Sequence, residues 1–371
     1  MQIHEQINMR ILVSEITSHQ KNLPHLYKLF SHQFDTSVFI HSKDQHAISN
    51  IPDGKILVSR LPKSLLYWYL CIASRRFSYI FLSTGPEYAV GFSGIIQTLG
   101  FYVLSVCYPK KLILHIRNTN NYLPEKNFFS GVMIQKLRIW AVKHINRFTF
   151  DSKLTYHYFR SKYHRTDSTL QTVIAINYSD IRFLKEPDHQ SGTGKIRIGM
   201  IGRIDVNRKD YDLIYRLQEQ LGEISAQLEF VILGECKDPK SQEIIAKIEK
   251  YSKVIYSNGY LSDEEFEELG LSCAILFAPL TDNYGYGLTK ETGAFGDAIY
   301  LHKKVIIPQF ACTNGEFDPI SEYYASSDDL LSIFRNLTDN PDSERFRVDK
   351  AYLTDYSTSR IFERITEELH L

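Results

Sequence analysis

Hydrophobic and polar positions follow two alternating patterns along the chain. Short runs rich in β-branched and aromatic residues, typical of buried strands, are separated by longer stretches whose apolar residues have helical spacing. Strands that alternate with helices form βαβ units in a parallel sheet covered by helices on both faces. In the first half the pattern predicts strands at 10–14, 37–41, 55–60, 79–83, 112–116, 147–150 and 170–176, and helices at 22–31, 63–77, 87–106, 129–145 and 153–163.

A polar stretch at 177–194 interrupts this pattern and is typical of a linker. A second series then predicts strands at 196–200, 228–233, 254–256, 274–278 and 305–307, and helices at 210–221, 239–251, 262–271, 288–302, 328–337 and 361–369. The 371 residues are enough for two domains. We therefore expect an α/β protein with two doubly wound domains, 1–185 and 186–355, followed by a C-terminal helix in 356–371.

The charge distribution also separates the two halves. The chain has 43 Lys and Arg and 43 Asp and Glu, but residues 1–185 contain 23 of the basic and only 10 of the acidic residues. A basic surface could face anionic lipid, a phosphorylated acceptor or nucleic acid. Two oppositely charged domains that face each other would explain the same asymmetry. No nucleic-acid-binding motif is present, so we do not expect a nucleic-acid partner.

Other features favour a cytoplasmic protein. The N-terminus is polar and unlike a signal peptide, and the five cysteines are scattered without any C-x-x-C pair. Residues 88–109 contain no charge and are long enough to cross a bilayer. Glycines and polar residues dilute this segment, so we expect a buried helix there instead of a membrane span.

The first candidate site follows the predicted strand at 196–200. Gly202 and Arg203 come at the turn after this strand, and Lys209 precedes the next helix. In open parallel sheets, ligands bind at the carboxyl ends of strands beside helix N-termini. Arg203 and Lys209 would supply two cations there for a phosphate or diphosphate. A solvated loop is the alternative interpretation.

Two later stretches have a similar arrangement. In 257–268, Ser262 and Glu265 form a predicted capping box, which leaves Tyr260 in the preceding turn as the residue that points to a ligand. In 279–298 a strand leads into a glycine-rich loop and a helix. Gly285 and Gly287 would let backbone N–H groups approach a phosphate, and Glu291 could accept hydrogen bonds from sugar hydroxyls.

In this order and spacing, the three stretches resemble the nucleotide-sugar half of a GT-B glycosyltransferase of the bacterial polysaccharide type (family 4-like, or group 1). The resemblance covers about 195–310 well, and the architecture extends it to the whole chain. It implies two Rossmann-like domains that face each other across a cleft. It also implies a C-terminal helix that returns to the first domain.

The resemblance implies that Arg203 and Lys209 bind the donor diphosphate, and a loop that is one residue longer lets Arg208 share this role. Glu291 matches the second of two family glutamates, which holds the ribose, but Asn283 stands where the first would be. The retaining or inverting outcome is therefore undecided. The remaining implied donor-binding residues are Gly202, Gly285, Gly287, Leu288 and Thr289.

The basic half contains the candidates for the acceptor side. His115 ends a predicted strand, and Asn118 follows it closely. The resemblance implies that both lie near the donor sugar as catalytic residues beside Glu291. A structural histidine is the alternative. Glu15 and His19, in the loop after the first strand, are acceptor-side or general-base candidates.

The resulting hypothesis is a metal-independent glycosyltransferase without a cofactor, because no Asp-x-Asp metal motif appears. Its donor would be a UDP- or GDP-sugar, and its acceptor a glycan or a polyprenyl-diphosphate-linked sugar. One alternative is a nucleotide-sugar epimerase of the same fold, which needs its own carboxylates and a His across the cleft. Another is a non-catalytic GT-B partner subunit, which the substitution at Asn283 favours.

Aromatic and basic residues in the first half also predict peripheral contact with an anionic membrane on the inner face of the cell membrane. Residues 65–70 are apolar and aromatic, and Arg75 and Arg76 follow them. A second group shares one predicted helix: Lys136, Arg138, Trp140 and Lys143. Ordinary amphipathic helices would give the same pattern.

Overall fold

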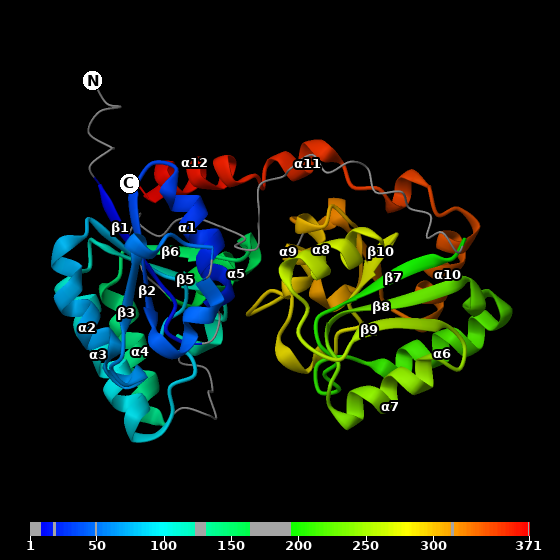
Figure 1. The fold of residues 1–371 in the computed structure, drawn as a ribbon, viewed down its shortest axis with the longest axis horizontal. Helices are drawn as coiled ribbons and strands as arrows, with labels where there is room; N and C mark the ends of the chain where they lie inside the picture. The colour runs from blue at the N-terminus through cyan, green and yellow to red at the C-terminus, as the bar shows by residue number, and fades with distance from the viewer. Residues whose placement is uncertain are drawn as a thin grey trace. The chain divides into compact units, whose positions relative to one another are not determined.

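A computed structural model describes residues 9–17, 20–48, 50–122, 131–163, 194–312, 315–369 and 371. The chain divides into two compact units (Figure 1). Unit 1 comprises Met1–Asn177 and Thr358–Leu371, and unit 2 comprises Tyr178–Ser357. The strand expected at 170–176 and nearly all of the expected linker lie outside the described residues.

Unit 1 is built on a six-stranded parallel sheet with the order β3-β2-β1-β4-β5-β6. Its strands are β1 (Arg10–Ser14), β2 (Asp35–His41), β3 (Ile56–Ser59), β4 (Tyr79–Leu82), β5 (Leu112–Ile116) and β6 (Arg147–Phe150). All six agree with the sequence prediction to within a few residues. The strand order reverses between β1 and β4, and ligands of open α/β sheets bind at this switch point.

The helices of unit 1 are α1 (Leu23–Ser31), α2 (Leu66–Ala73), α3 (Gly91–Cys107), α4 (Val132–His144), α5 (Lys153–Lys162) and the C-terminal α12 (Thr358–Leu369). Helix α3 packs against both α2 and α4. Helix α12 packs against α1, although more than 300 residues separate them. The ring of Phe362 lies 6.5 Å from that of Phe30 and 5.6 Å from that of Phe34. Aromatic contacts therefore hold the end of the chain in unit 1.

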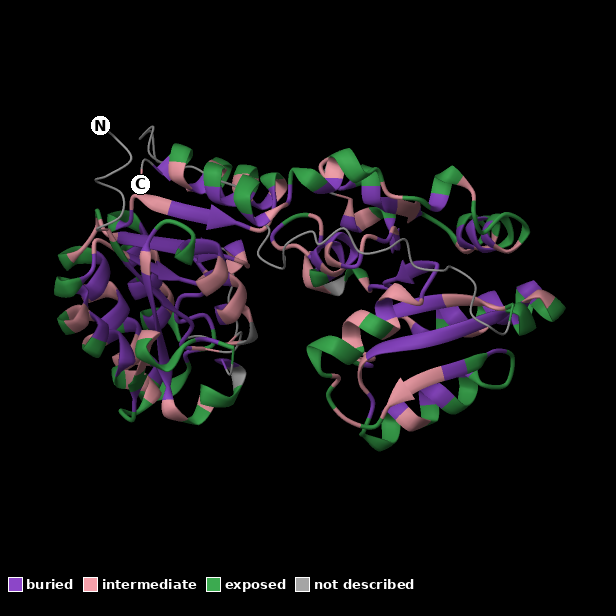
Figure 2. Cartoon of the chain, turned by 45° about the horizontal axis from the view of Figure 1, so that its top comes forward, coloured by how far each residue is buried: buried purple, intermediate pink, exposed green. Residues whose placement is uncertain are grey.

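Unit 2 repeats the same topology in the order β12-β11-β10-β7-β8-β9, again with parallel strands. The strands are β7 (Ile196–Ile201), β8 (Leu228–Glu235), β9 (Lys253–Ser257), β10 (Ile275–Phe277), β11 (Val305–Pro308) and β12 (Ser321–Tyr324). Most strand residues of both sheets are buried (Figure 2). The switch point of unit 2 lies between β7 and β10.

The helices of unit 2 are α6 (Tyr211–Leu221), α7 (Pro239–Ile248), α8 (Asp263–Leu271), α9 (Gly293–Tyr300), α10 (Ser327–Asp339) and α11 (Lys350–Thr354). Ile214, Ile245 and Phe334, from α6, α7 and α10, share one buried core. Ser262 and Glu265 form the capping box that the sequence predicts at the start of α8.

Three elements differ from the sequence prediction. Strand β12 was not predicted, because an edge strand of four residues with a polar start shows little apolar pattern. The short helix α11 was also not predicted. Helix α9 begins at Gly293 instead of 288, because Gly285 and Gly287 adopt positive φ and Thr292 caps the helix. Among the described residues, no helix has the length and hydropathy needed to span a bilayer.

Candidate functional site

A cavity of about 190 Å³ lies at the switch point of unit 2, where the carboxyl ends of β7 and β10 meet the N-terminus of α9. We call it the switch-point pocket. Four predicted donor-binding residues line it together: Gly202, Arg203, Arg208 and Lys209. The pocket is lined by three basic side chains and by two acidic ones, Asp205 and Asp297, at the positive end of a helix dipole. The excess of basic groups and the helix N-terminus suit an anion.

Backbone geometry shapes the turn that presents Arg203. Gly202 has φ +74°, a conformation that glycine adopts most readily. The end of β8 passes so close that a Cβ on Gly234 would lie 2.3 Å from the amide nitrogen of Arg203. Gly234 is thus a site-forming residue that the sequence analysis missed, although a glycine directly after the strand predicted at 228–233 was an available signal.

Lys209 holds the same turn. Its Nζ donates hydrogen bonds to the carbonyl oxygens of Gly202 at 3.0 Å, Arg203 at 2.8 Å and Ile201. These bonds occupy all three donors of an ammonium group. Burial, assisted by the nearby Arg208 charge, lowers the pKa of Lys209 to about 7. In this structure Lys209 therefore positions the turn, and Arg203 and Arg208 remain as the cations at the pocket.

Aromatic side chains orient Arg208. Its Nε donates to the hydroxyl of Tyr286 at 2.9 Å, and its guanidinium lies 5.9 Å from the ring of Tyr284. Lys290 lies 4.5 Å from the ring of Tyr286, and burial lowers the pKa of this lysine to about 8. Cations next to aromatic faces are stabilised there. The sequence analysis missed Tyr284, Tyr286 and Lys290, whose only signal was their place in the glycine-rich loop.

Asp297, on α9, also lines the pocket. Burial raises the pKa of its carboxyl to about 7, against the opposing effect of Lys209. This carboxyl is thus partly protonated near neutral pH, which weakens its repulsion of a bound anion.

The other predicted donor-binding residues do not line the switch-point pocket. Thr289 is buried and bonds back to the Gly285 carbonyl through its N–H at 3.0 Å, so it closes the loop on itself. Leu288 is half exposed, and Glu291 is partly buried directly before Thr292, the cap of α9. Tyr260 is 70% exposed after β9. The backbone at Asn283 forms a 3₁₀ turn, Asp282–Tyr284; its side chain lies outside the described part of the structure.

At the switch point of unit 1, Glu15 follows β1. Its Oε1 accepts hydrogen bonds from the Thr17 N–H at 2.8 Å, the Thr17 hydroxyl at 2.8 Å and the Thr84 hydroxyl at 2.6 Å. The side chain is fully buried, so these bonds join the ends of β1 and β4. His19 lies outside the described residues.

His115, at the end of β5, is completely buried. Its Nδ1 lies 2.9 Å from the Thr149 hydroxyl and its Nε2 lies 3.0 Å from the Asp151 carboxylate. Burial lowers the pKa of the imidazole. A neutral ring then carries its proton on Nε2, donates it to Asp151 and accepts from Thr149. The side chain links β5 to the end of β6, while Asn118 accepts from the Asn120 N–H at 3.1 Å and caps a 3₁₀ turn, Thr119–Asn121. Their catalytic roles stay predictions.

A second buried cluster in unit 1 was not predicted. Arg138, which the sequence analysis placed on a basic surface, is buried and donates to the carbonyl oxygens of Glu87 at 3.0 Å, Ala89 at 3.3 Å and Pro86. That placement was wrong, because the backbone of the loop after β4 needs a donor. Tyr122 donates to the Glu87 carboxylate at 3.3 Å, and burial raises the pKa of Glu87 to about 7.

No metal-binding group can be assembled from the residues that the structure describes. They contain no set of three or more His, Cys, Asp or Glu side chains placed to share an ion.

Comparison with known proteins identifies the fold. No family profile matches the chain, and no curated protein matches it in sequence. Solved structures do match over almost the whole length. One is a putative UDP-N-acetylglucosamine 2-epimerase from Listeria monocytogenes, with a TM-score of 0.59 at 11% sequence identity. The match covers 98% of this chain and 96% of the epimerase chain.

Two further structures show the range of activities in this fold. The lipopolysaccharide outer core galactosyltransferase WaaB has a TM-score of 0.58 at 10% sequence identity. The match covers 98% of this chain and 99% of the WaaB chain. A UDP-GlcNAc 2-epimerase from Neisseria meningitidis, bound to UDP-GlcNAc, has a TM-score of 0.57 at 14% identity, with 98% and 100% covered. The chain therefore has the GT-B fold, with two Rossmann-like units, and this fold is shared by glycosyltransferases and epimerases.

Proposed function

We propose that this protein is a glycosyltransferase that moves a sugar from a nucleotide sugar to a glycan or lipid-linked acceptor. The observation that carries the proposal is the switch-point pocket of unit 2, where Arg203, Arg208 and the N-terminus of α9 converge. These groups suit the diphosphate of a donor, and UDP is the nucleotide named in the Neisseria structure with this fold.

The chemistry follows from where charge develops. An acceptor hydroxyl attacks the anomeric carbon, the bond from that carbon to the diphosphate oxygen breaks, and the hydroxyl proton passes to a base. Arg203, Arg208 and the amides at the start of α9 would stabilise the departing diphosphate. Glu291 is proposed for the ribose, and Glu15, on unit 1, for the acceptor side.

The first test is nucleotide binding by thermal shift. We expect UDP and UDP-sugars to stabilise the full-length chain more than GDP, CMP or ADP at equal concentration. Arg203→Ala should weaken UDP binding about tenfold or more, since a charge-assisted hydrogen bond contributes about 1.5–3 kcal/mol. Arg335→Ala, an exposed arginine on α10 of the same unit, is the matched control and should bind like the natural chain. Equal binding by both variants would contradict the donor site.

An epimerase is the second candidate, because epimerases are among the solved structures with this fold and unit 1 contains two buried carboxylates, Glu15 and Glu87. The two functions separate in one assay. An epimerase converts UDP-GlcNAc to its C2 epimer with no acceptor present, whereas a transferase leaves the sugar intact until an acceptor is added. A chain that binds nucleotide without either reaction would be a non-catalytic subunit.

We also propose that unit 1 contacts an anionic membrane. Phe92 is 78% exposed at the start of α3, Val132 is 71% exposed at the start of α4, and Met133 beside it is exposed too. Lys136 and Trp140 follow on the exposed side of α4. Exposed apolar side chains beside a lysine and a tryptophan suit the interface of an anionic leaflet.

Flotation with vesicles tests the membrane proposal. The chain should float with phosphatidylglycerol vesicles and much less with phosphatidylcholine vesicles, and flotation should fall at high salt. A Phe92→Ser, Val132→Ser variant should lose most of the binding, while Tyr251→Ser, an exposed aromatic of unit 2, should not. Equal flotation of both variants would exclude this surface.

A further inference from the structure

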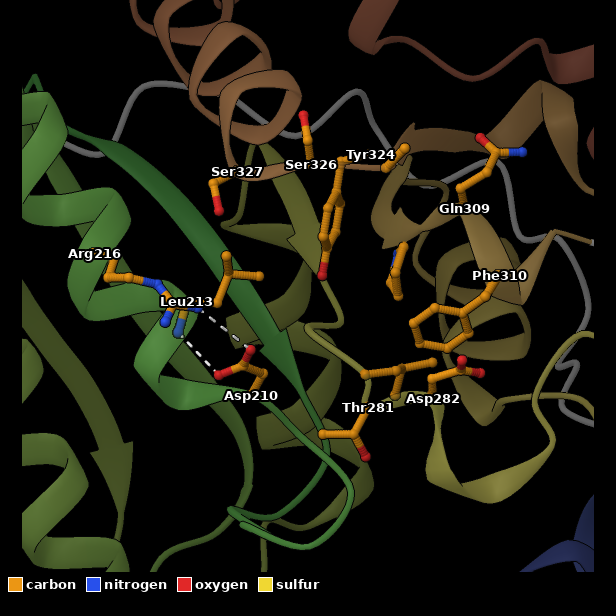
Figure 3. A pocket seen from close by; sticks show the side chains of 13 residues that line it. Asp210, Leu213, Arg216, Thr281, Asp282, Gln309, Phe310, Tyr324, Ser326 and Ser327 are labelled. Atoms are coloured by element: carbon orange, nitrogen blue, oxygen red, sulfur yellow. Dashed lines mark hydrogen bonds and ion pairs between the residues drawn. The ribbon is translucent and has the colours of Figure 1, made fainter.

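A second cavity of unit 2, about 600 Å³ in volume, is left unused by the proposed donor site. It lies between the start of α6, the carboxyl ends of β11 and β12, and the start of α10 (Figure 3). Its lining shares only Leu280 with the switch-point pocket. A volume of this size is within the range of small-molecule sites, about 300–1,000 Å³. We call it the α6–α10 pocket.

The hydroxyl of Tyr324 points into this pocket (Figure 3). The residue is only 6% exposed, because its ring packs edge-on against Phe277 in the core, with 6.3 Å between the ring centroids. The hydroxyl has no hydrogen-bond partner among the described residues. Buried phenol groups normally find a partner, so a rigidly held hydroxyl that faces a cavity is a ready contact for a ligand.

The other polar groups limit what that ligand can be. Asp210 and Asp282 contribute two carboxylates, and Arg216, 3.7 Å from Asp210, contributes one cation. The excess of negative charge opposes a phosphate or a carboxylate. A metal ion is equally unsuited, since no set of three ligating side chains exists among the described residues. The ligand is therefore expected to carry no negative charge.

The rest of the lining matches a molecule with both polar and apolar sides. Gln309 and Ser327 can donate and accept hydrogen bonds, and Phe310, Pro308 and Leu213 offer apolar surface. A sugar ring has hydroxyls around its edge and C–H groups on its faces. Carboxylates accept from such hydroxyls, and flat side chains cover such faces.

We propose that the α6–α10 pocket binds a neutral sugar residue of the glycan on which the protein acts, separately from the nucleotide. That the bound sugar belongs to the glycan substrate rests on the proposed function. That the pocket binds a sugar does not depend on the proposed function. A site of this kind would hold a saccharide on the same unit as the donor.

The test is ligand-observed NMR titration of the full-length chain with glucose, galactose, mannose and N-acetylglucosamine as probes. We expect at least one probe to bind, and Tyr324→Phe to weaken that binding about five- to tenfold by removing only the hydroxyl. Tyr323→Phe is the matched control, because neighbouring residues of a strand point to opposite faces of the sheet and Tyr323 is not in the pocket lining. It should bind like the natural chain.

Two comparisons make the result decisive. Saturating UDP should leave probe binding unchanged, and Tyr324→Phe should leave the UDP thermal shift unchanged. The proposal is overturned if no probe binds, if Tyr324→Phe binds as tightly as Tyr323→Phe, or if UDP displaces the probe. A different result would separate the two proposals. If the chain binds no nucleotide but binds a probe that Tyr324→Phe weakens, the proposed donor site is refuted and the saccharide site in the α6–α10 pocket is supported.

Discussion

Gly287→Ala is expected to abolish nucleotide binding and to destabilise unit 2. Gly287 has φ +71°, and a Cβ built there would lie 2.2 Å from the carbonyl oxygen of Phe310 and 2.9 Å from the Cα of Ala311. Both contacts are backbone atoms, so a rotamer change cannot relieve them. The strained φ alone costs about 1–3 kcal/mol. Relief of the clash must move the loop that holds Tyr286 beside Arg208.

Denaturant unfolding and a UDP thermal shift check this prediction. Gly259→Ala is the matched control: Gly259 lies in another loop of unit 2, its φ is not positive, and a Cβ there would meet no atom within 4 Å. The control should keep both stability and binding. If Gly287→Ala behaved like Gly259→Ala, the loop would not depend on its close approach to the 309–311 turn.

Phe362→Ala is expected to cost unit 1 about 3–5 kcal/mol, which is the usual effect of removing a buried phenylalanine. The Phe362 side chain is 3% exposed and contacts Phe30 and Phe34, so the substitution leaves a cavity between α12 and α1. The hydrogen bond from Arg147 Nε to the Leu369 carbonyl, at 2.9 Å, would still connect the end of α12 to β6.

Hydrogen exchange measured by segment is the appropriate readout, because a chain with two units need not unfold in one step. Exchange should accelerate in α1 and α12 and remain unchanged in α6 and α7 of unit 2. Phe92→Ala removes an exposed phenylalanine from the same unit and should change little. Unchanged exchange in α1 would show that the stability of α1 does not depend on its contact with Phe362.

The architecture was largely predictable because strands and helices of a doubly wound fold have strong local signals. The strands at 10–14, 112–116 and 147–150 coincide with β1, β5 and β6. Buried parallel strands are nearly continuous apolar runs, and such a run can be recognised without knowing which strands lie beside it. Strand β12 lacked the signal, since an edge strand needs fewer apolar residues.

The residues of the switch-point pocket were predictable only in part. Gly202, Arg203, Arg208 and Lys209 do line one pocket, because a strand end followed by a helix start places them at one edge of the sheet. The sequence could not show that the Lys209 ammonium turns back onto the carbonyls of its own turn. It also could not show that Tyr286 would orient Arg208, 78 residues away.

Buried polar residues were the least predictable. Arg138 belongs to a helix with exposed lysines. Its side chain is buried because it donates hydrogen bonds to backbone carbonyls of the loop after β4. His115 and Asp151 meet because β5 and β6 are neighbours in the sheet. Hydrogen-bond partners that lie far apart along the chain leave no local pattern.

Alone, the sequence determined the two α/β halves, the boundaries of most elements and the strand end that lines the switch-point pocket. These properties depend on local periodicity and on glycine and capping residues, which act within a few positions. The tertiary structure decided which polar side chains face a cavity and which bond to distant backbone. It also decided that α12 packs on α1 and that the hydroxyl of Tyr324 faces the α6–α10 pocket. These outcomes depend on contacts across the sheet and between helices, which only the folded chain brings together.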